Sequence, residues 1–141
     1  MATYLSGERR LSVVLLVAPG DSEMERMVAM TPELRGLPVY SSTGIRPLMQ
    51  LASLVEGALF AVTMDTSLVH FASATQTPVL AFYAELIMWK EWAPYHIPCG
   101  VLLTPAGRSI SGIPIESMIQ KADEFIVATF PGGLPAISRS L

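Results

Sequence analysis

Short apolar runs alternate with amphipathic segments along most of the chain. Five runs have the length of buried strands, and they cover residues 11–18, 37–40, 59–64, 79–83 and 100–104. The segments between and after them predict helices over residues 23–30, 47–57, 67–74, 86–92 and 114–130. This alternation predicts an α/β fold, with a Rossmann-like parallel sheet of about five strands and helices on both of its faces.

The polar residues that follow the run 59–64 are the main candidates for binding chemistry. Asp65, Thr66 and Ser67 come directly after the run, and His70 lies one turn into the next helix. In parallel sheets, ligands bind beyond the carboxyl ends of the strands, where helix N-termini converge. Thr66 or Ser67 can cap the helix, whose free N–H groups and dipole then form a site for phosphate. His70 shares a helix face with both residues.

Asp65 needs a different role, because a carboxylate and a phosphate are both negative. We expect it either to hold the turn through backbone N–H groups or to accept a hydrogen bond from a sugar hydroxyl. A purely structural interpretation stays open, since Asp-Thr-Ser after a strand is an ordinary way to start a helix. A single His on a short helix is also commonly a surface residue.

A family resemblance rests on the motif Asp65-Thr66-Ser67-Leu68-Val69-His70-Phe71-Ala72-Ser73-Ala74, followed by Thr77-Pro78-Val79. It resembles the signature of glycosyltransferase family 9, which contains the bacterial lipopolysaccharide heptosyltransferases: Asp-Thr-(Gly or Ser)-x-x-His-x-Ala-x-Ala, then a Pro that opens the next strand. Residues 45–58 are similar to the helix before the signature strand, and residues 92–95 are similar to a Trp/Gly-x-Pro turn after it. The resemblance covers residues 11–125. Two departures are Ser67, where Gly is common, and Ala84, where a Gly often follows the strand.

The resemblance implies the C-terminal, donor-binding half of a GT-B glycosyltransferase, in which two Rossmann-like domains face each other across a cleft. It implies that Asp65, Thr66, Ser67 and His70 contact the diphosphate and sugar of a nucleotide-sugar substrate, such as an ADP-heptose-like donor. Glu23 is the nearest match to an acid that contacts the ribose or sugar in the family, although helix capping explains it equally well. The implied reaction is heptosyl or hexosyl transfer in lipopolysaccharide or other cell-surface glycan synthesis, with no metal and no cofactor.

Other parts of such an enzyme have no match in this sequence. In the family, the catalytic base and the acceptor site lie in an N-terminal domain, and the donor domain has a first β–α unit and a phosphate-binding Lys. We therefore assign no catalytic residue and expect a fragment, a partner-dependent subunit or a degenerate orphan. One alternative is a noncatalytic interaction module on a glycosyltransferase scaffold. A remote alternative is a receiver-like signalling domain with Asp65 as phosphoacceptor, although the acidic cluster for Mg²⁺ and the Lys of such domains are missing.

Size and charge narrow the classes of protein further. The 141 residues fit a single domain over residues 1–141, and we expect residues 131–141 to be a loose tail. A net charge of −3 argues against a nucleic-acid surface. Apolar runs stay below the ~18 residues of a membrane span, and the single Cys99, which we expect to be buried, suits a reducing compartment. These features predict a cytoplasmic protein, with peripheral attachment to the inner membrane as an option.

The composition is unusually apolar. Hydrophobic residues make up 51% of the chain and charged residues 15%, whereas soluble domains carry about 25% charged residues. A small domain cannot bury so much apolar surface, so we expect a homo-oligomer or a protein partner that covers residues 11–17 or 86–92. Trp89 and Trp92 share one helix face, and they either form a base-stacking platform or pack under a loop.

Overall fold

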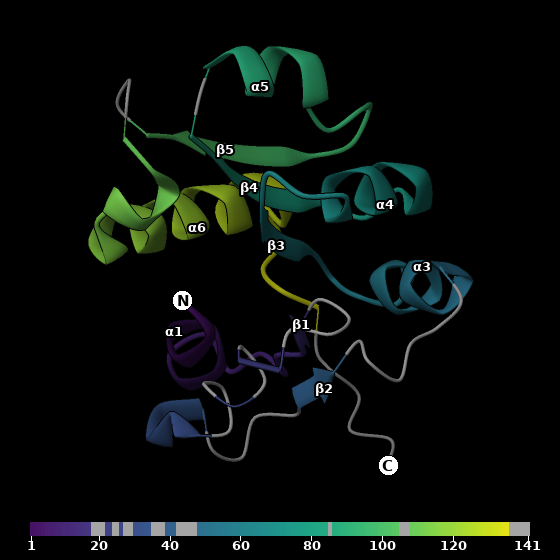
Figure 1. The fold of residues 1–141 in the computed structure, drawn as a ribbon. Coiled ribbons are helices and arrows are strands. Elements are labelled where there is room, and N and C mark those ends of the chain that lie inside the picture. Colours follow the sequence, from purple (N-terminus) through teal and green to yellow (C-terminus); the bar gives the residue numbers. More distant parts are fainter. Residues whose placement is uncertain are drawn as a thin grey trace. The chain divides into compact units, whose positions relative to one another are not determined.

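The computed structural model describes residues 1–17, 22–23, 26, 30–34, 39–41, 48–84, 86–104 and 108–135. It divides into two compact units, Met1–Leu54 and Val55–Leu141, which are described separately. Figure 1 shows the order of the elements along the chain. Of the helix expected over residues 23–30, the described residues Glu23, Arg26 and Met30 are helical. Residues 136–141 of the expected tail lie outside the described residues.

The second unit is built on a three-stranded parallel sheet. Its strands are β3 (Ala61–Met64), β4 (Val79–Tyr83) and β5 (Cys99–Leu103), in the order β3-β4-β5. Val79 of β4 lies between Ala61 of β3 and Cys99 of β5 in the register. All five residues of β4 are buried, as expected of a central parallel strand that is covered on both faces.

Helices cover the two faces of this sheet. After β3 the chain runs through α4 (Leu68–Thr75) to β4, through α5 (Leu86–Trp92) to β5, and then into α6 (Ile115–Thr129). Helix α3 (Leu48–Glu56), which precedes β3, spans the boundary between the two units. Figure 1 shows α5 and α6 on opposite sides of the sheet. The two βαβ crossovers run in the same direction, and right-handed crossovers of this kind place their helices on one face.

Alternate residues of β4 pack against the helices of the two faces. On the face of α4 and α5, Ala81 and Tyr83 form a buried cluster with Val69, and Met88, Trp89, Val101 and Leu103 pack against it. On the face of α6, a Cβ atom at Gly100 would lie 2.9 Å from Leu80 Cδ1 and 3.0 Å from Phe125 Cβ. A glycine at this position of β5 therefore allows α6 to pack closely on the sheet.

The segment between α4 and β4 is short because the helix ends abruptly. Gln76 adopts a left-handed conformation with a φ of 58°, and its side-chain amide donates a hydrogen bond of 2.9 Å to the Ser73 carbonyl. The buried Thr77 then donates its hydroxyl to the Val55 carbonyl, at 3.0 Å. The Thr77 bond ties the segment after α4 to the last turn of α3.

The first unit contains a smaller parallel sheet. Its strands β1 (Leu15–Val17) and β2 (Val39–Ser41) pair with Leu15 opposite Val39. A short 3-10 helix, η1 (Pro32–Leu34), lies between them in sequence. Helix α1 (Ala2–Gly7) precedes both strands and was not expected from the sequence pattern. Its buried Tyr4 accepts a hydrogen bond of 2.8 Å from the Arg9 guanidinium.

The α/β prediction is confirmed in its coarser form, because parallel strands alternate with helices. A single sheet of about five strands is not confirmed, since the described strands pair as one sheet of two and one of three. The half of a GT-B fold and the single domain over residues 1–141 remain predictions. No described helix combines the length and the apolar character that a bilayer crossing needs.

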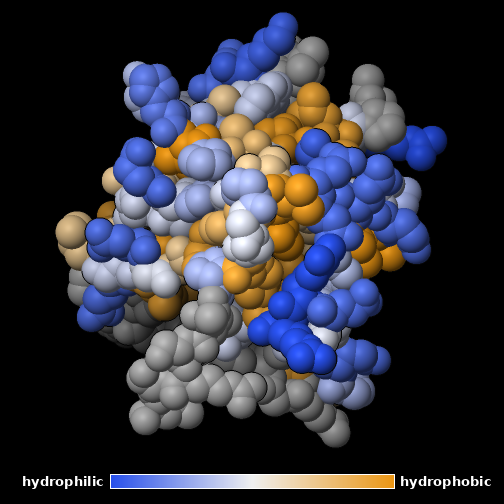
Figure 2. Space-filling model, turned by 180° about the vertical axis from the view of Figure 1, so that it is seen from behind, coloured by the Kyte–Doolittle hydropathy of each residue, from blue (hydrophilic) through white to orange (hydrophobic). Residues whose placement is uncertain are grey.

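Apolar side chains remain at the surface, in line with the composition. Figure 2 shows hydrophobic residues exposed among hydrophilic ones on one face of the molecule. Among the described residues, the exposed large hydrophobic ones are Val14, Met30, Leu48, Met49, Met64, Trp92, Tyr95, Ile115 and Val127.

Candidate functional site

The candidate site lies where β3 ends and α4 begins. β3 ends at Met64, Asp65 and Thr66 form a bend, and Ser67 leads into α4 at Leu68. The neighbouring strand β4 is parallel to β3 and ends at Tyr83. The carboxyl ends of both strands therefore meet at the same edge of the sheet, which is where ligands of parallel α/β proteins bind.

Thr66, rather than Ser67, supplies the side-chain contacts that hold the start of α4. Ser67 already has helical dihedral angles, and its side chain makes no capping hydrogen bond. The hydroxyl of Thr66 accepts a hydrogen bond of 3.3 Å from the Leu68 N–H and pairs with the Thr63 hydroxyl at 2.8 Å. Both Thr66 and Ser67 are exposed, so this turn is open to a ligand.

Some backbone N–H groups near this turn already donate hydrogen bonds to carbonyl groups of the turn. The N–H of Val69 donates to the Thr66 carbonyl at 3.1 Å, and the N–H of His70 donates to the Ser67 carbonyl at 3.0 Å. Within the described residues, the N–H groups of Thr66 and Ser67 have no acceptor. These two groups are the backbone donors that the turn can offer to an anion.

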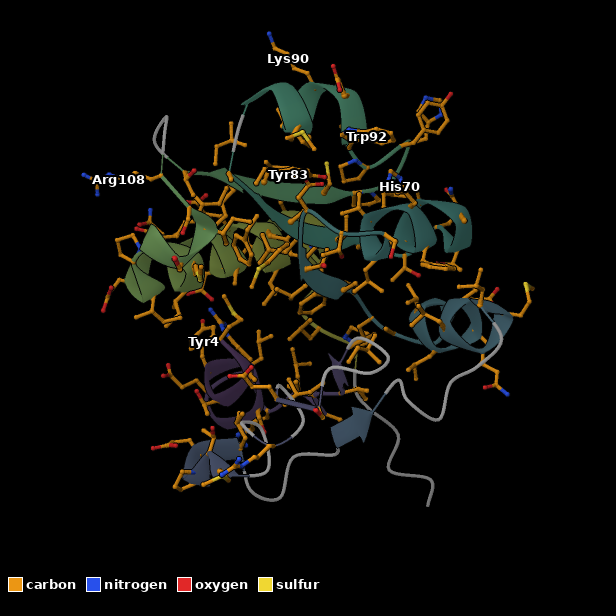
Figure 3. All side chains as sticks on the ribbon, in the orientation of Figure 1. Tyr4, His70, Tyr83, Lys90, Trp92 and Arg108 are labelled. Carbon is orange, nitrogen blue, oxygen red and sulfur yellow. The ribbon has the colours of Figure 1, made fainter. Side chains whose placement is uncertain are left out.

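His70 lies on α4 beside an aromatic side chain of α5. The imidazole is exposed, and it packs edge-on against the indole of Trp92 with ring centroids 5.6 Å apart and planes at 70°. The Trp92 side chain is itself 47% exposed. Figure 3 shows the two side chains next to each other, one from each helix.

Tyr83, the last residue of β4, contacts the same helix α5. It is buried, its hydroxyl donates a hydrogen bond of 3.0 Å to the Trp92 carbonyl, and its ring packs edge-on against Trp89. Burial raises the pKa of Tyr83 to about 12, and the negative charge of Asp65 adds to this effect, as does Cys99 to a smaller extent.

The loop after α5 is also connected to α4. The hydroxyl of Ser73 accepts a hydrogen bond of 2.9 Å from the Tyr95 N–H and donates one of 3.0 Å to the Val69 carbonyl. The rings of Tyr95 and His96 stack with centroids 3.9 Å apart. Tyr95 is 69% exposed, so this loop presents a second aromatic surface one helical turn beyond His70.

Comparison with protein families identifies the family to which the chain belongs. The family model for glycosyltransferase family 9 (heptosyltransferase) matches residues 3–103 of the 141. The chain belongs to this family. The matched range includes the turn, all of α4 and the loop after α5, and it begins earlier and ends earlier than the expected range of residues 11–125. Comparisons with curated proteins and with solved structures gave no match.

The family 9 signature implies four residues that contact the donor, and these four lie together in the structure. Asp65, Thr66, Ser67 and His70 all lie on the turn after β3 or on the first turn of α4. Within the described residues, no hydrogen bond joins the Asp65 carboxylate to this turn, and Thr66 holds it instead. A contact between Asp65 and a sugar hydroxyl stays a prediction, as does a donor contact for Glu23, an exposed residue of the first unit.

Sequence reasoning missed three features of this family 9 site. Tyr83 and Ser73 gave no signal, because their hydrogen bonds reach residues far along the chain. For Trp89 and Trp92 the sequence left open a stacking platform or packing under a loop, and it did not indicate that Trp89 packs on Tyr83 while Trp92 contacts His70.

The expectation for Cys99 was wrong. The residue is exposed, because it is the first residue of β5 and lies outside the packed part of that strand. Partial burial of its sulfur nevertheless raises the pKa of the thiol. A raised pKa lowers the fraction of reactive thiolate, so Cys99 has no feature of a nucleophile.

A further property of the described residues is their capacity to bind a metal ion. Among them, no group of three or more His, Cys, Asp and Glu side chains is arranged to hold a metal ion.

Proposed function

We propose that this chain binds the nucleotide-sugar donor of a heptosyltransferase-like glycosyltransferase, with the donor's diphosphate at the start of α4. The observation that carries this proposal is the position of the family 9 signature. Its Thr66, Ser67 and His70 lie together where β3 ends and α4 begins, at the edge of a parallel sheet where phosphate ligands bind.

Each residue has a role that follows from its chemistry. The Thr66 hydroxyl holds the bend through Thr63 and Leu68, so the N–H groups of Thr66 and Ser67 stay available to phosphate oxygens. The exposed imidazole of His70 donates a further hydrogen bond to the diphosphate, because helical side chains lean toward the helix start. Asp65 accepts a hydrogen bond from a sugar hydroxyl. The contact of Glu23 with the ribose or sugar stays what the resemblance implies.

The wider role we propose is heptosyl or hexosyl transfer in lipopolysaccharide or other cell-surface glycan synthesis. An ADP-heptose-like donor is the substrate, and no metal takes part. The resemblance puts the catalytic base and the acceptor site in a separate N-terminal domain, so we propose that such a domain or a protein partner completes the enzyme. We place this assembly in the cytoplasm, with peripheral attachment to the inner membrane as an option.

Calorimetry with ADP, UDP and GDP in the absence of Mg²⁺ tests the proposal. We expect weak binding, and we expect His70→Ala to weaken it roughly 10- to 100-fold, the size of a lost hydrogen bond to a charged group. Gln120→Ala is the matched control, because Gln120 is an exposed residue of α6 that bonds only to its neighbour Glu124 among the described residues. Absence of binding by all three nucleotides, or binding that is indifferent to His70, would favour a noncatalytic interaction module instead.

A further inference from the structure

Strand β5 forms one edge of the three-stranded sheet and pairs only with β4 among the described residues. The hydrogen bonds at the two ends of this pairing show which backbone groups face β4. The Pro98 carbonyl accepts a bond of 3.0 Å from the Val79 N–H, and the Thr104 N–H donates one of 3.0 Å to the Tyr83 carbonyl. Because the backbone groups of a strand point alternately to its two sides, every second residue between Pro98 and Thr104 also faces β4.

The backbone groups of Cys99, Val101 and Leu103 therefore point to the open side of β5. Within the part of the chain that the structure describes, no hydrogen bond uses these groups on that side. Cys99 is exposed, and Val101 and Leu103 are partly exposed. Each of the three residues offers one donor and one acceptor, and such groups at a sheet edge pair readily with a further strand.

β5 also lacks the features that block the edges of natural sheets. Its five residues, Cys-Gly-Val-Leu-Leu, include no charged residue and no proline. Its register with β4 is unbroken from Cys99 to Leu103, so no bulge turns the edge away. An edge that is uncharged, regular and mostly apolar is open to the addition of another strand.

The free backbone groups of this edge are complementary to themselves. In an antiparallel pair, two residues whose groups face each other exchange two hydrogen bonds. A two-fold axis beside Val101 places this residue opposite Val101 of a second copy, and it places Cys99 opposite Leu103 of that copy. All the free groups of the three residues then have partners. A second copy thus matches this edge by symmetry alone.

We infer that two copies of the chain associate through antiparallel pairing of their β5 strands, which joins their three-stranded sheets into one. The pairing leaves the candidate site open, because that site follows β3, at the other edge of the sheet. It also differs from an association through residues 11–17, which belong to the first unit. Both contacts together would build assemblies larger than a dimer.

Thiol cross-linking tests the contact and its register. Residues that pair in this way have Cα atoms about 5.5 Å apart, within the reach of a disulfide. Cys99 of one copy lies four residues along the strands from Cys99 of the other, roughly 14 Å away, so mild oxidation with copper phenanthroline should not cross-link the unmodified chain. Leu103→Cys should give a covalent dimer of twice 15.2 kDa. Adding Cys99→Ser to that variant should abolish the covalent dimer.

A second pair of variants leaves Leu103 unchanged, because its side chain packs against the buried cluster. Cys99→Pro removes an N–H that points to the open side, at the first residue of a strand, where proline is tolerated. It should weaken dimerisation in analytical ultracentrifugation roughly 5- to 100-fold, the size of two lost main-chain hydrogen bonds. Cys99→Ala keeps the N–H and should dimerise as the unmodified chain does.

The outcomes distinguish this contact from others. Cross-linking of the unmodified chain, or none in folded Leu103→Cys, would overturn the inferred register. Equal dimerisation of Cys99→Pro and Cys99→Ala would show that the edge of β5 takes no part. Val14→Lys alters the first unit and should leave the cross-link of Leu103→Cys intact. Loss of the cross-link in that combination would overturn the β5 contact in favour of residues 11–17.

Discussion

The hydroxyl of Tyr83 donates a hydrogen bond of 3.0 Å to the carbonyl of Trp92, nine residues further along the chain. This bond joins the end of the central strand to the end of α5. A phenol can donate only while it is protonated. The position of Trp92 beside His70 therefore depends on a buried hydroxyl that keeps its proton.

The raised pKa of Tyr83 predicts a loss of stability at alkaline pH. Between pH 10.0 and about 12, the phenol is ionised in the unfolded chain but still protonated in the folded one. The free energy of unfolding therefore falls as the pH rises through this range, and the full contribution is present below it. Because the hydrogen bond is only partly buried, solvent screening limits the effect to on the order of 1 kcal/mol.

Urea denaturation of the unmodified chain and of Tyr83→Phe across this pH range measures the effect. The substituted chain should lose less stability than the unmodified chain as the pH rises, although it starts lower because the Trp92 carbonyl has lost its donor. Parallel losses in the two proteins would show that Tyr83 titrates no differently when folded.

Gly100→Ala should destabilise the second unit. A Cβ atom at this position would lie 2.9 Å from Leu80 Cδ1 and 3.0 Å from Phe125 Cδ2, so α6 would have to move away from the sheet. Overpacking of this kind costs about 1–3 kcal/mol of unfolding free energy. Gly112→Ala is the matched control, because nothing lies within 4 Å of its added Cβ atom. Equal denaturation midpoints for the two variants would contradict the packing of α6 described above.

Ser73→Ala should loosen the segment that carries Tyr95. The substitution removes the acceptor of the Tyr95 N–H, and we expect that amide to exchange its hydrogen faster, with a loss of about 1 kcal/mol in unfolding free energy. Ser109→Ala removes a hydroxyl that pairs only with exposed Ser111 among the described residues, and it should leave the Tyr95 amide unaffected. The measurement is hydrogen exchange followed by NMR, and unchanged exchange in Ser73→Ala would show that this bond does not hold the segment.

The chain should self-associate or require a partner. Within the described residues, β3 pairs with β4 alone, and unpaired strand edges recruit other chains. Burial of several hundred Å² of apolar surface at ~25 cal/mol per Å² can offset the entropy of association. Of the two regions expected from the sequence, residues 11–17 are the favoured surface, because β1 pairs with β2 alone among the described residues and Val14, just before β1, is exposed.

Light scattering over a dilution series tests this association. Val14→Lys places a charge on a residue of the favoured surface that is 38% exposed, and it should shift the chain toward the monomer. Val127→Lys, on α6, alters a more exposed apolar residue outside that surface and should have no such effect. A well-folded 15.2 kDa monomer at high micromolar concentration would rule the association out.

The isolated chain should not transfer sugar. No residue of the sequence matches the base of the family, and without a base the acceptor hydroxyl is not activated. Incubation with a nucleotide-heptose and a lipid A–core acceptor should yield no product. Detectable turnover would show that the chain contains a base that the resemblance does not identify.

The sequence predicted the elements of the second unit well because their patterns are local. The unbroken apolar run over residues 79–83 has the same bounds as β4, since a central parallel strand is apolar on both faces. The periodicity over residues 114–130 predicted α6, which spans Ile115–Thr129. The Asp-Thr-Ser-x-x-His spacing likewise predicted that the residues proposed to bind the nucleotide-sugar lie close together at the start of α4.

Features that depend on tertiary packing could not be predicted. Helix α1 has only six residues, too few to show a helical period. The contact of His70 with Trp92, and the bonds that Tyr83 and Ser73 make to the segment after α5, depend on how α4 and α5 lie on the sheet. The choice of Thr66 over Ser67 to hold the turn depends on Thr63, whose side chain points to the same face of the bend.

The hydroxyl groups of Tyr83 and Ser73, which bond to the segment after α5, also affect the entropy of ligand binding. Tyr83 and Ser73 fix Trp92 and Tyr95 before any ligand arrives, so little conformational freedom remains to be lost on binding. Ordering one mobile side chain costs about 0.5–1.5 kcal/mol, which for a weakly bound nucleotide is a large share of the total. Because these bonds order the backbone of the segment before binding, they raise the affinity for any ligand that the segment contacts.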